Sequence, residues 1–223
     1  MDYRTRIEKQ RKRKNIDETK FENGSEVEFI KSNGKKFKVK VKKFAEYVDE
    51  VISGEYEKNN PSQDVLLSQN TPKIFLDNVV NAKNKPILIN VSHIKKAIGL
   101  HKKGNHSLNV QQLKQVSQAI FDPIAIIKNE KHGSYNLLLK LSNANKNKTI
   151  VSLKLEGKSN FYNARIESNI ASTVFDVYSN KDYINNTVEE KNIIYLKRIT
   201  KKELINLANK DYPYQVGSKF NNI

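Results

Sequence analysis

The fold is decided by residues 86–127, which comprise PILIN (86–90), VSHIKKAIGLHKKGNH (91–106), SLNVQQLKQVSQAIFD (107–122) and PIAII (123–127). The apolar spacing predicts a strand, a helix capped by Ser92, a second helix and a second strand. The second helix has the clearest start, because Asn109 is a favoured N-cap and Gln112 follows three residues later, as in a capping box. His106 is therefore predicted to lie in the turn between the two helices.

Strand patterns dominate the chain after this stretch. Apolar and polar residues alternate in short runs that are separated by turn-rich segments, which is typical of an antiparallel meander. The predicted strands are 124–128, 135–141, 149–155, 170–177 and 192–197, with an Asn-rich loop before 170 and a short helix over 181–190. The sequence thus predicts an α+β domain in which two helices pack on a four- to five-stranded antiparallel sheet.

The first 65 residues have a different character. Residues 1–24 contain the run Arg-Lys-Arg-Lys at 11–14 and are predicted to form a flexible basic arm. Residues 25–65 are predicted to form an accessory unit of a β-hairpin and one helix over 44–56, and the turn-rich segment 57–70 is the expected boundary. The main domain is then 71–201, and 202–223 form a C-terminal tail.

The turn of the predicted hairpin contains Asn33 and Gly34. A two-residue loop would place Phe29 opposite a lysine and mix the two faces of the hairpin. A three-residue loop or a bulge is therefore preferred, and we expect it to pair Phe29 with Val39 and Glu28 with Lys40.

Composition limits the classes of partner. The 223-residue chain has a formal net charge of +16, which indicates an anionic partner. Nucleic acid is the first expectation, followed by an anionic membrane or an acidic cognate protein, while a general lysine and asparagine bias is the alternative explanation. The chain has no cysteine, so disulfides and zinc–thiolate sites are excluded. No apolar run reaches the roughly 20 residues of a membrane-spanning helix, and the N-terminus lacks the apolar core of a secretory signal.

No established enzymatic motif is present, and the main domain has few carboxylates. A metal-dependent nuclease is disfavoured because it needs carboxylates for its ions. Histidine, lysine, hydroxyl and tyrosine side chains remain, and these can supply the acid, the base and the cation of a metal-independent ribonuclease. His106, beside Lys102 and Lys103, is the first candidate for proton transfer, although a histidine that packs the turn is the alternative. His93 and His101 are weaker candidates, and His132 is expected to be merely exposed.

Polar residues on the predicted strands complete the candidate site. Lys154 and Ser152 lie on the non-core face of a strand, and Ser172 and Thr173 follow a loop that contains Arg165. The predicted catalytic residues are His106, Lys154, Ser172 and Tyr195. The predicted substrate-binding residues are His93, Lys96, Lys102, Lys103, Ser152, Arg165, Thr173 and Lys197.

The order of motifs over 71–201 resembles the C-terminal domains of phage MuF-type proteins and related mobile-element toxins, the phage barnase/EndoU/colicin/RelE-like (PBECR) nucleases. The resemblance rests on the turn at 106–108 with its following helix and Asp122-Pro123, on 170–175, and on the late strand that ends in YLK at 195–197. It implies an RNase-like fold with a catalytic cleft on an open sheet face. His106 and Ser172 are the positions that coincide best with the family pattern.

Two hypotheses follow. The first is a toxin-type, metal-independent endoribonuclease that needs no cofactor, attacks RNA (tRNA among the substrates considered) through its 2′-hydroxyl, and has an acidic cognate immunity or antitoxin protein as a partner. The second is a non-catalytic nucleic-acid-binding or phage interaction protein on the same scaffold. In both cases we expect a soluble protein, acting in the bacterial cytoplasm or delivered with a phage or mobile element.

Overall fold

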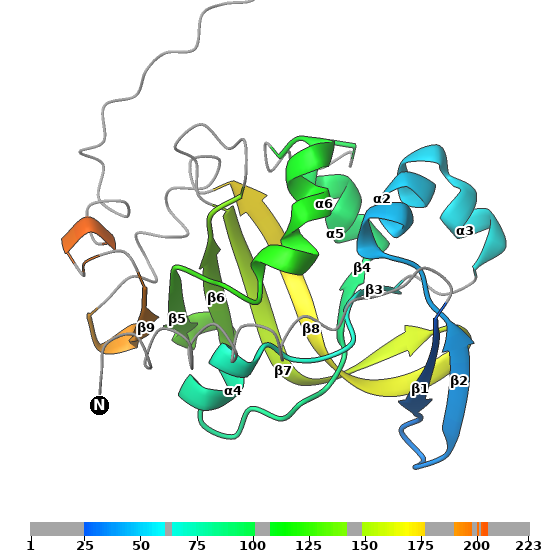
Figure 1. Cartoon of the computed structure of the whole chain (residues 1–223), viewed down its shortest axis with the longest axis horizontal. Coiled ribbons are helices and arrows are strands. Elements are labelled where there is room, and N and C mark those ends of the chain that lie inside the picture. Colours follow the sequence, from blue (N-terminus) through cyan, green and yellow to red (C-terminus); the bar gives the residue numbers. More distant parts are fainter. Residues whose placement is uncertain are drawn as a thin grey trace, which may run out of the picture.

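The computed structural model describes residues 25–60, 64–100, 108–141, 149–176, 190–197, 200 and 202–204 (Figure 1). The predicted arm (1–24), most of the predicted helix over 181–190 and most of the predicted tail lie outside these residues. The elements, in chain order, are β1 (Glu26–Ile30), β2 (Lys36–Lys40), α2 (Phe44–Ser53), α3 (Glu55–Asn59), β3 (Asp64–Ser68), α4 (Lys73–Asn78), β4 (Ile87–Asn90), α5 (Val91–Ala97), α6 (Val110–Ala119), β5 (Ala125–Asn129), the 3-10 helix η1 (Glu130–His132), β6 (Ser134–Leu139), β7 (Thr149–Phe161), β8 (Ala164–Asp176), η3 (Glu190–Asn192) and β9 (Ile193–Leu196).

A seven-stranded sheet forms the centre of the described structure. Its strand order is β3-β4-β8-β7-β6-β5-β9, and every neighbouring pair is antiparallel except β4–β8, which is parallel. The predicted α+β class is confirmed, whereas the predicted sheet of four to five strands is too small. The additional strand β3 lies in the segment 57–70 that is the expected boundary, and the parallel β4–β8 pair joins β3 and β4 to the meander. The RNase-like packing stays a prediction.

The β7–β8 hairpin is longer than its pattern indicates. Both strands have 13 residues, and they replace the Asn-rich loop that was expected before residue 170. A two-residue turn makes this possible, because Tyr162 and Asn163 both adopt positive φ, 46° and 59°, as a tight hairpin turn requires. Two register shifts interrupt the ladder and bend the hairpin.

The far end of this hairpin packs against β1, β2 and α2. The Ser32 amide donates to the Arg165 carbonyl at 2.8 Å, and the Phe29 and Phe161 rings meet edge to face at 5.2 Å. Buried side chains of α2 share one core with the sheet. The division of the chain into an accessory unit and a main domain stays a prediction.

The predicted pairing within the first hairpin is wrong. Phe29 lies opposite Phe37, and Glu28 lies opposite Lys38. The loop itself has the predicted three residues, 32–34, since the Gly34 amide donates to the Lys31 carbonyl and Gly34 has φ 81°. The loop lies one residue earlier than the expected pairing implies, because Lys31 is opposite Lys35. Every pair therefore lies two places from the expected register, and the aromatic residues still share one face.

The helices agree with the sequence more closely. The Asn109–Gln112 capping box is present at the start of α6. At α5 the cap is Asn90, whose side chain accepts from the Ser92 amide, rather than Ser92 itself. The single helix predicted over 44–56 is divided into α2 and α3 because Gly54 adopts φ 77°, a conformation that ends a helix.

The two faces of the sheet differ in what covers them. On the helix-covered face, side chains of β5–β8 share one core with side chains of the helices α2 to α6. This core includes Ile126, Leu137, Val151, Leu153, Val48, Tyr56, Phe75, Ile94 and Leu113. Figure 1 shows α4 and α6 on this side of the strands. On the opposite face, a separate cluster contains Ala125, Ile127, Leu138, Ile150, Phe175 and Leu204.

Candidate functional site

Four of the predicted site residues come together on β7 and β8. Ser152 lies directly opposite Thr173 in the antiparallel ladder. Ser172 is the extra residue of a β-bulge at this point, and its hydroxyl donates to the Ser152 carbonyl at 3.3 Å. Lys154 follows two residues after Ser152 and is exposed. Bulges often redirect side chains next to functional sites, so this part of the sheet is the candidate site.

A partner that the sequence analysis missed lies on β6. Asn136 pairs with Ser152 across the ladder, and the Ser152 hydroxyl donates to the Asn136 side-chain oxygen. Asn136 is 0% exposed and Ser152 is 1% exposed. A signal was present in the sequence, since each residue is a polar one inside an apolar run, YNLLL and TIVSL. Only the register of the strands shows that the two meet.

These residues belong to a larger group at one end of the opposite face. Strand alternation places Asn136 on the same side as Leu138, and Ser152 on the same side as Ile150. Ser134 and Asn129 extend the group on β6 and β5, where they lie opposite each other. We call Asn129, Ser134, Asn136, Ser152, Lys154 and Thr173 the polar cluster.

The polar cluster is costly to bury. Buried hydroxyl and amide groups lose hydration, and the loss must be offset by hydrogen bonds within the protein. Ser134 is 3% exposed, and its hydroxyl has no hydrogen-bond partner in the described part of the chain. Buried polar side chains at this end of the sheet, with the Ser134 hydroxyl unsatisfied, lower stability, and such a destabilising group is a candidate for function.

Lys154 gives the polar cluster a positive charge. In the described ranges no carboxylate forms an ion pair with its ammonium group, whereas nearby lysines are paired: Lys83 with Glu156 at 2.9 Å and Lys85 with Glu167 at 2.8 Å. Hydrogen bonding to these lysines lowers the pKa of both glutamates. These two glutamates are thus already paired, whereas the exposed Lys154 has no carboxylate partner among the described residues.

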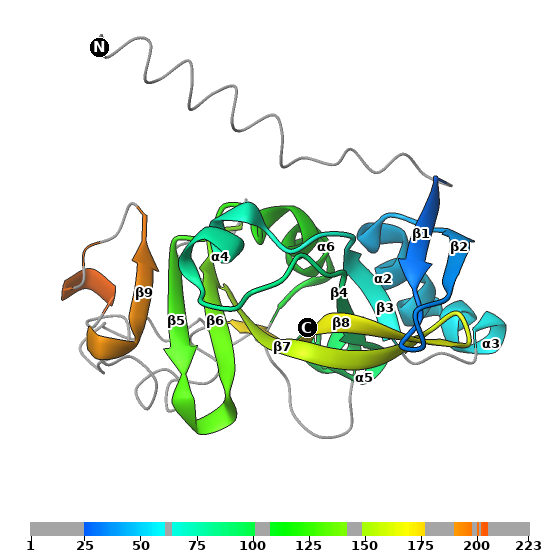
Figure 2. The ribbon, with the colours of Figure 1, turned by 90° about the horizontal axis from the view of Figure 1, so that it is seen from below.

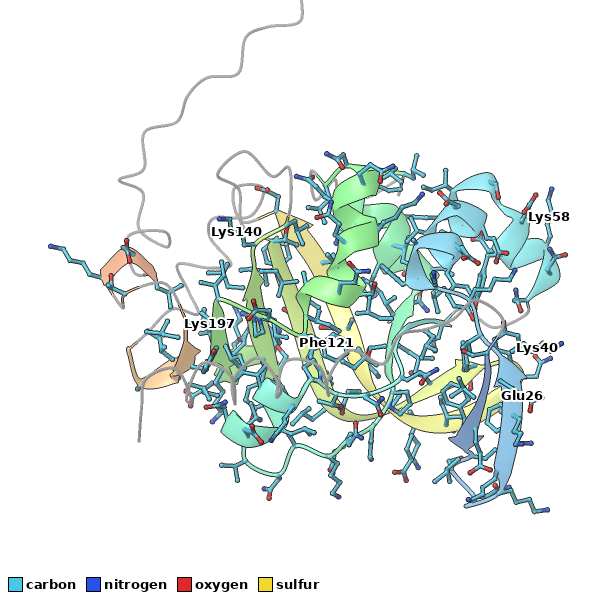
Figure 3. The ribbon with its side chains drawn as sticks, in the orientation of Figure 1. Glu26, Lys40, Lys58, Phe121, Lys140 and Lys197 are labelled. Atoms are coloured by element: carbon cyan, nitrogen blue, oxygen red, sulfur yellow. The ribbon has the colours of Figure 1, made fainter. Side chains whose placement is uncertain are left out.

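The other predicted residues of β9, β8 and α5 lie elsewhere. Tyr195 is opposite Ile126 and packs against the helix-side core, so it lies on the other face from Ser152. Lys197 pairs with Asp122 near β9, at the end of the molecule remote from Lys40 and Glu26 (Figure 3). Arg165 is exposed near the tip of the β7–β8 hairpin. His93 and Lys96 lie on α5, which packs against β8 on the helix-covered side.

His106, Lys102 and Lys103 lie outside the described residues, and so does His101. The first described residue after that segment belongs to the helix-covered side. The Leu108 amide donates to the Ala97 carbonyl at 3.0 Å, and Leu108 is buried in the helix-side core. The predicted role of His106 stays a prediction.

The described part of the chain holds neither a metal-binding cluster nor a membrane-spanning helix. Among these residues there is no group of three or more histidine or acidic side chains that could hold a metal ion. No helix among them is long and apolar enough to cross a membrane.

The comparison with protein families connects this geometry to a known domain. Residues 96–203 match the family model of the phage MuF C-terminal domain. This match begins at Lys96, covers just under half of the chain and contains the whole polar cluster. The predicted likeness to a phage MuF C-terminal domain is thus confirmed for these residues, whereas membership of the PBECR nucleases stays a prediction. No curated protein and no solved structure matches the chain significantly.

Proposed function

We propose that the protein is a toxin-type, metal-independent endoribonuclease that cleaves RNA by attack of a 2′-hydroxyl on the neighbouring phosphate. One observation carries the proposal. Ser152, Lys154, Ser172 and Thr173, selected from the sequence for this chemistry, lie together on β7 and β8 within the part that matches the phage MuF C-terminal domain.

The reaction needs three contributions. One group removes the proton from the 2′-hydroxyl, a second protonates the leaving 5′-oxygen, and a cation or hydrogen-bond donors stabilise the charge on the phosphate. The Lys154 ammonium supplies the positive charge, and the hydroxyl of Thr173, which lies opposite Ser152, supplies a donor. His106 is the predicted acid or base.

The substrate is inferred from charge. The net charge of +16 favours a polyanion, and counterion release makes such binding strong at low salt. Lys154 is a cation without a carboxylate partner in the described ranges, next to donors that suit phosphate oxygens. RNA is the polyanion that offers both the phosphate and the 2′-hydroxyl.

The test is cleavage of purified tRNA and rRNA in EDTA, with the same sequences in 2′-deoxy form as the control. We expect discrete cleavage of RNA alone. Lys154→Ala is expected to reduce the rate at least tenfold, whereas Lys73→Ala, whose ammonium pairs with Asp77 on α4, changes it by less than twofold. Absence of cleavage by the parent protein, or equal cleavage of the deoxy substrate, would contradict the proposal.

A second candidate is a nucleic-acid-binding or phage interaction protein without catalysis. The deep burial of Asn136 and Ser152 favours it, because these side chains are removed from direct contact with a large ligand. For this candidate we expect salt-sensitive RNA binding with no cleavage, and no growth arrest when the protein is produced in a bacterial host.

A further inference from the structure

The connection between β5 and β6 holds a histidine at the edge of the polar cluster. The short helix η1 forms this connection, and the backbone amide of His132 donates to the Asn129 side-chain oxygen at 3.3 Å. Asn129 is 1% exposed and alternates with Ile127, so its side chain lies on the opposite face of the sheet. This hydrogen bond therefore holds the η1 turn against the opposite face of the sheet.

The fold agrees with this placement. Phe75 of α4 meets Tyr135, the second residue of β6, edge to face at 5.4 Å, so α4 covers the helix-covered side of the sheet at this end of the hairpin; Figure 2 shows α4, β5 and β6. Ser134 begins β6 two residues after His132, and Lys154 lies one place beyond the Tyr135–Leu153 pair, next to Ser134. The turn thus brings His132 to the end of the cluster that contains the lysine and the unsatisfied serine hydroxyl.

The other described histidine, His93, lies on the helix-covered side, because α5 carries it and packs in the helix-side core. His132 is exposed, so a large substrate can reach it. Of the two histidines in the described ranges, it is the one attached to the face that carries the polar cluster.

We propose that His132 is one of the two proton-transfer groups of this site, an inference that rests on the proposed ribonuclease function. In the reaction the 2′-oxygen bonds to phosphorus while the bond from phosphorus to the 5′-oxygen breaks. The product is a 2′,3′-cyclic phosphate and a free 5′-hydroxyl. One proton leaves the 2′-hydroxyl and one reaches the 5′-oxygen, and His132 carries one of these two protons.

The experiment is single-turnover RNA cleavage in EDTA by the full chain and by His132→Ala. We expect the rate to fall at least 100-fold, which is a usual contribution of general acid–base catalysis, and added imidazole to restore part of it. Affinity for the 2′-deoxy analogue and the thermal midpoint should not change, because His132 is exposed and its backbone makes the bond to Asn129. Lys131→Ala is the matched control in the same turn, with a rate within threefold of the parent and no response to imidazole.

Each outcome has a distinct meaning. If the parent cleaves RNA and His132→Ala cleaves within threefold of it, the inference is wrong and the proposed function stands. If His132→Ala loses affinity for the deoxy analogue and imidazole restores nothing, His132 is a binding residue and the inference is also wrong. If the parent cleaves no RNA, the proposed function fails and the inference fails with it.

Discussion

The same strands of the sheet carry different kinds of side chain on its two faces. On the helix-covered face, Leu137, Val151 and Leu153 belong to a core shared with the helices α2 to α6. On the opposite face, the apolar cluster around Leu138 and Ile150 gives way to the polar cluster. Since neighbouring residues of one strand point to opposite faces, Leu153 serves packing while Ser152 beside it serves the candidate site.

The difference is also one of energy. Apolar burial stabilises the helix-covered face in proportion to the area removed from water. The polar cluster needs hydrogen bonds to offset lost hydration, and the Ser134 hydroxyl lacks one in the described part of the chain. We therefore expect substitutions on the helix-covered face to affect mainly stability, and substitutions in the polar cluster on the opposite face to affect mainly activity.

The largest expected effect on stability is that of Leu153→Ala. Leu153 is 0% exposed, and a cavity in a packed core costs about 2–5 kcal/mol of unfolding free energy. Denaturant unfolding measures this loss of unfolding free energy. Leu155→Ala is the control with a smaller expected loss, because Leu155 is only partly buried. Under conditions where Leu153→Ala remains folded, RNA cleavage should persist. A loss below about 1 kcal/mol would contradict the assignment of this face to packing.

The double variant Asn136→Leu/Ser152→Ala makes the opposite face apolar. Ser152→Ala alone should cost about 1–3 kcal/mol, because Asn136 loses a buried hydrogen bond. Replacing both partners by apolar groups removes that penalty, so the double variant is expected to regain most of the loss. Denaturant unfolding of both single variants and the double variant measures the coupling. If the losses of unfolding free energy in Asn136→Leu and Ser152→Ala simply add in the double variant, the hydrogen bond between the two side chains does not contribute to stability.

Tyr47 shows how a polar group behaves on the helix-covered side. Its hydroxyl accepts from the Lys42 amide at 3.2 Å and lies 3.3 Å from the Tyr162 hydroxyl. Burial raises the pKa of Tyr47 well above its usual value of 10.0, so the folded state keeps a proton that the unfolded state releases above that pH. This contribution to stability is complete below about pH 10 and declines as the pH rises further.

Tyr47→Phe is therefore expected to cost about 1 kcal/mol at pH 7, the value of a typical hydrogen bond, and to lessen the decline in stability above pH 10. Thermal midpoints from pH 7 to 11 test this, with the parent as reference. An unchanged alkaline decline would mean that Tyr47 titrates normally.

Lys154→Ala should have the smallest effect on stability, within about 0.5 kcal/mol, because the side chain is exposed. Its effect is expected on RNA binding. Loss of one phosphate contact to a single strand lowers the slope of log affinity against log salt by about 0.7. Fluorescence anisotropy over a salt series measures the slope, and Lys83→Ala, whose ammonium pairs with Glu156, is the control. Equal slopes for the two variants would remove Lys154 from the RNA-binding surface.

The sequence predicts local structure well where the signal is local. The capping box at Asn109 and the alternation in 149–155 involve residues near each other in the chain, and both are present. The β7–β8 hairpin extends past the prediction because its turn uses Tyr162 and Asn163 at positive φ, a conformation that Tyr rarely adopts. The strand β3 and its place in the sheet depend on pairing with β4, and no short sequence pattern predicts that pairing.

The sequence predicts the candidate site only in part, because the site also depends on how strands pair. The sequence indicates Ser152, Lys154, Ser172 and Thr173 as polar residues on or beside predicted strands, and they lie together because β7 and β8 are adjacent. Asn136 was missed because its importance arises from the β6–β7 register. Tyr195 was expected near them but lies on the other face, since a one-residue difference in a strand reverses the side.

The most direct test of the central claim, that the polar end of the opposite face is a ribonuclease site, compares the parent with Asn136→Leu/Ser152→Ala. Both proteins are incubated with RNA in EDTA at a temperature where denaturant unfolding shows each to be folded. We predict that the parent cleaves RNA and leaves its 2′-deoxy form intact, and that the double variant cleaves at least tenfold more slowly. Equal rates for the two proteins, or no cleavage by the parent, would contradict the claim.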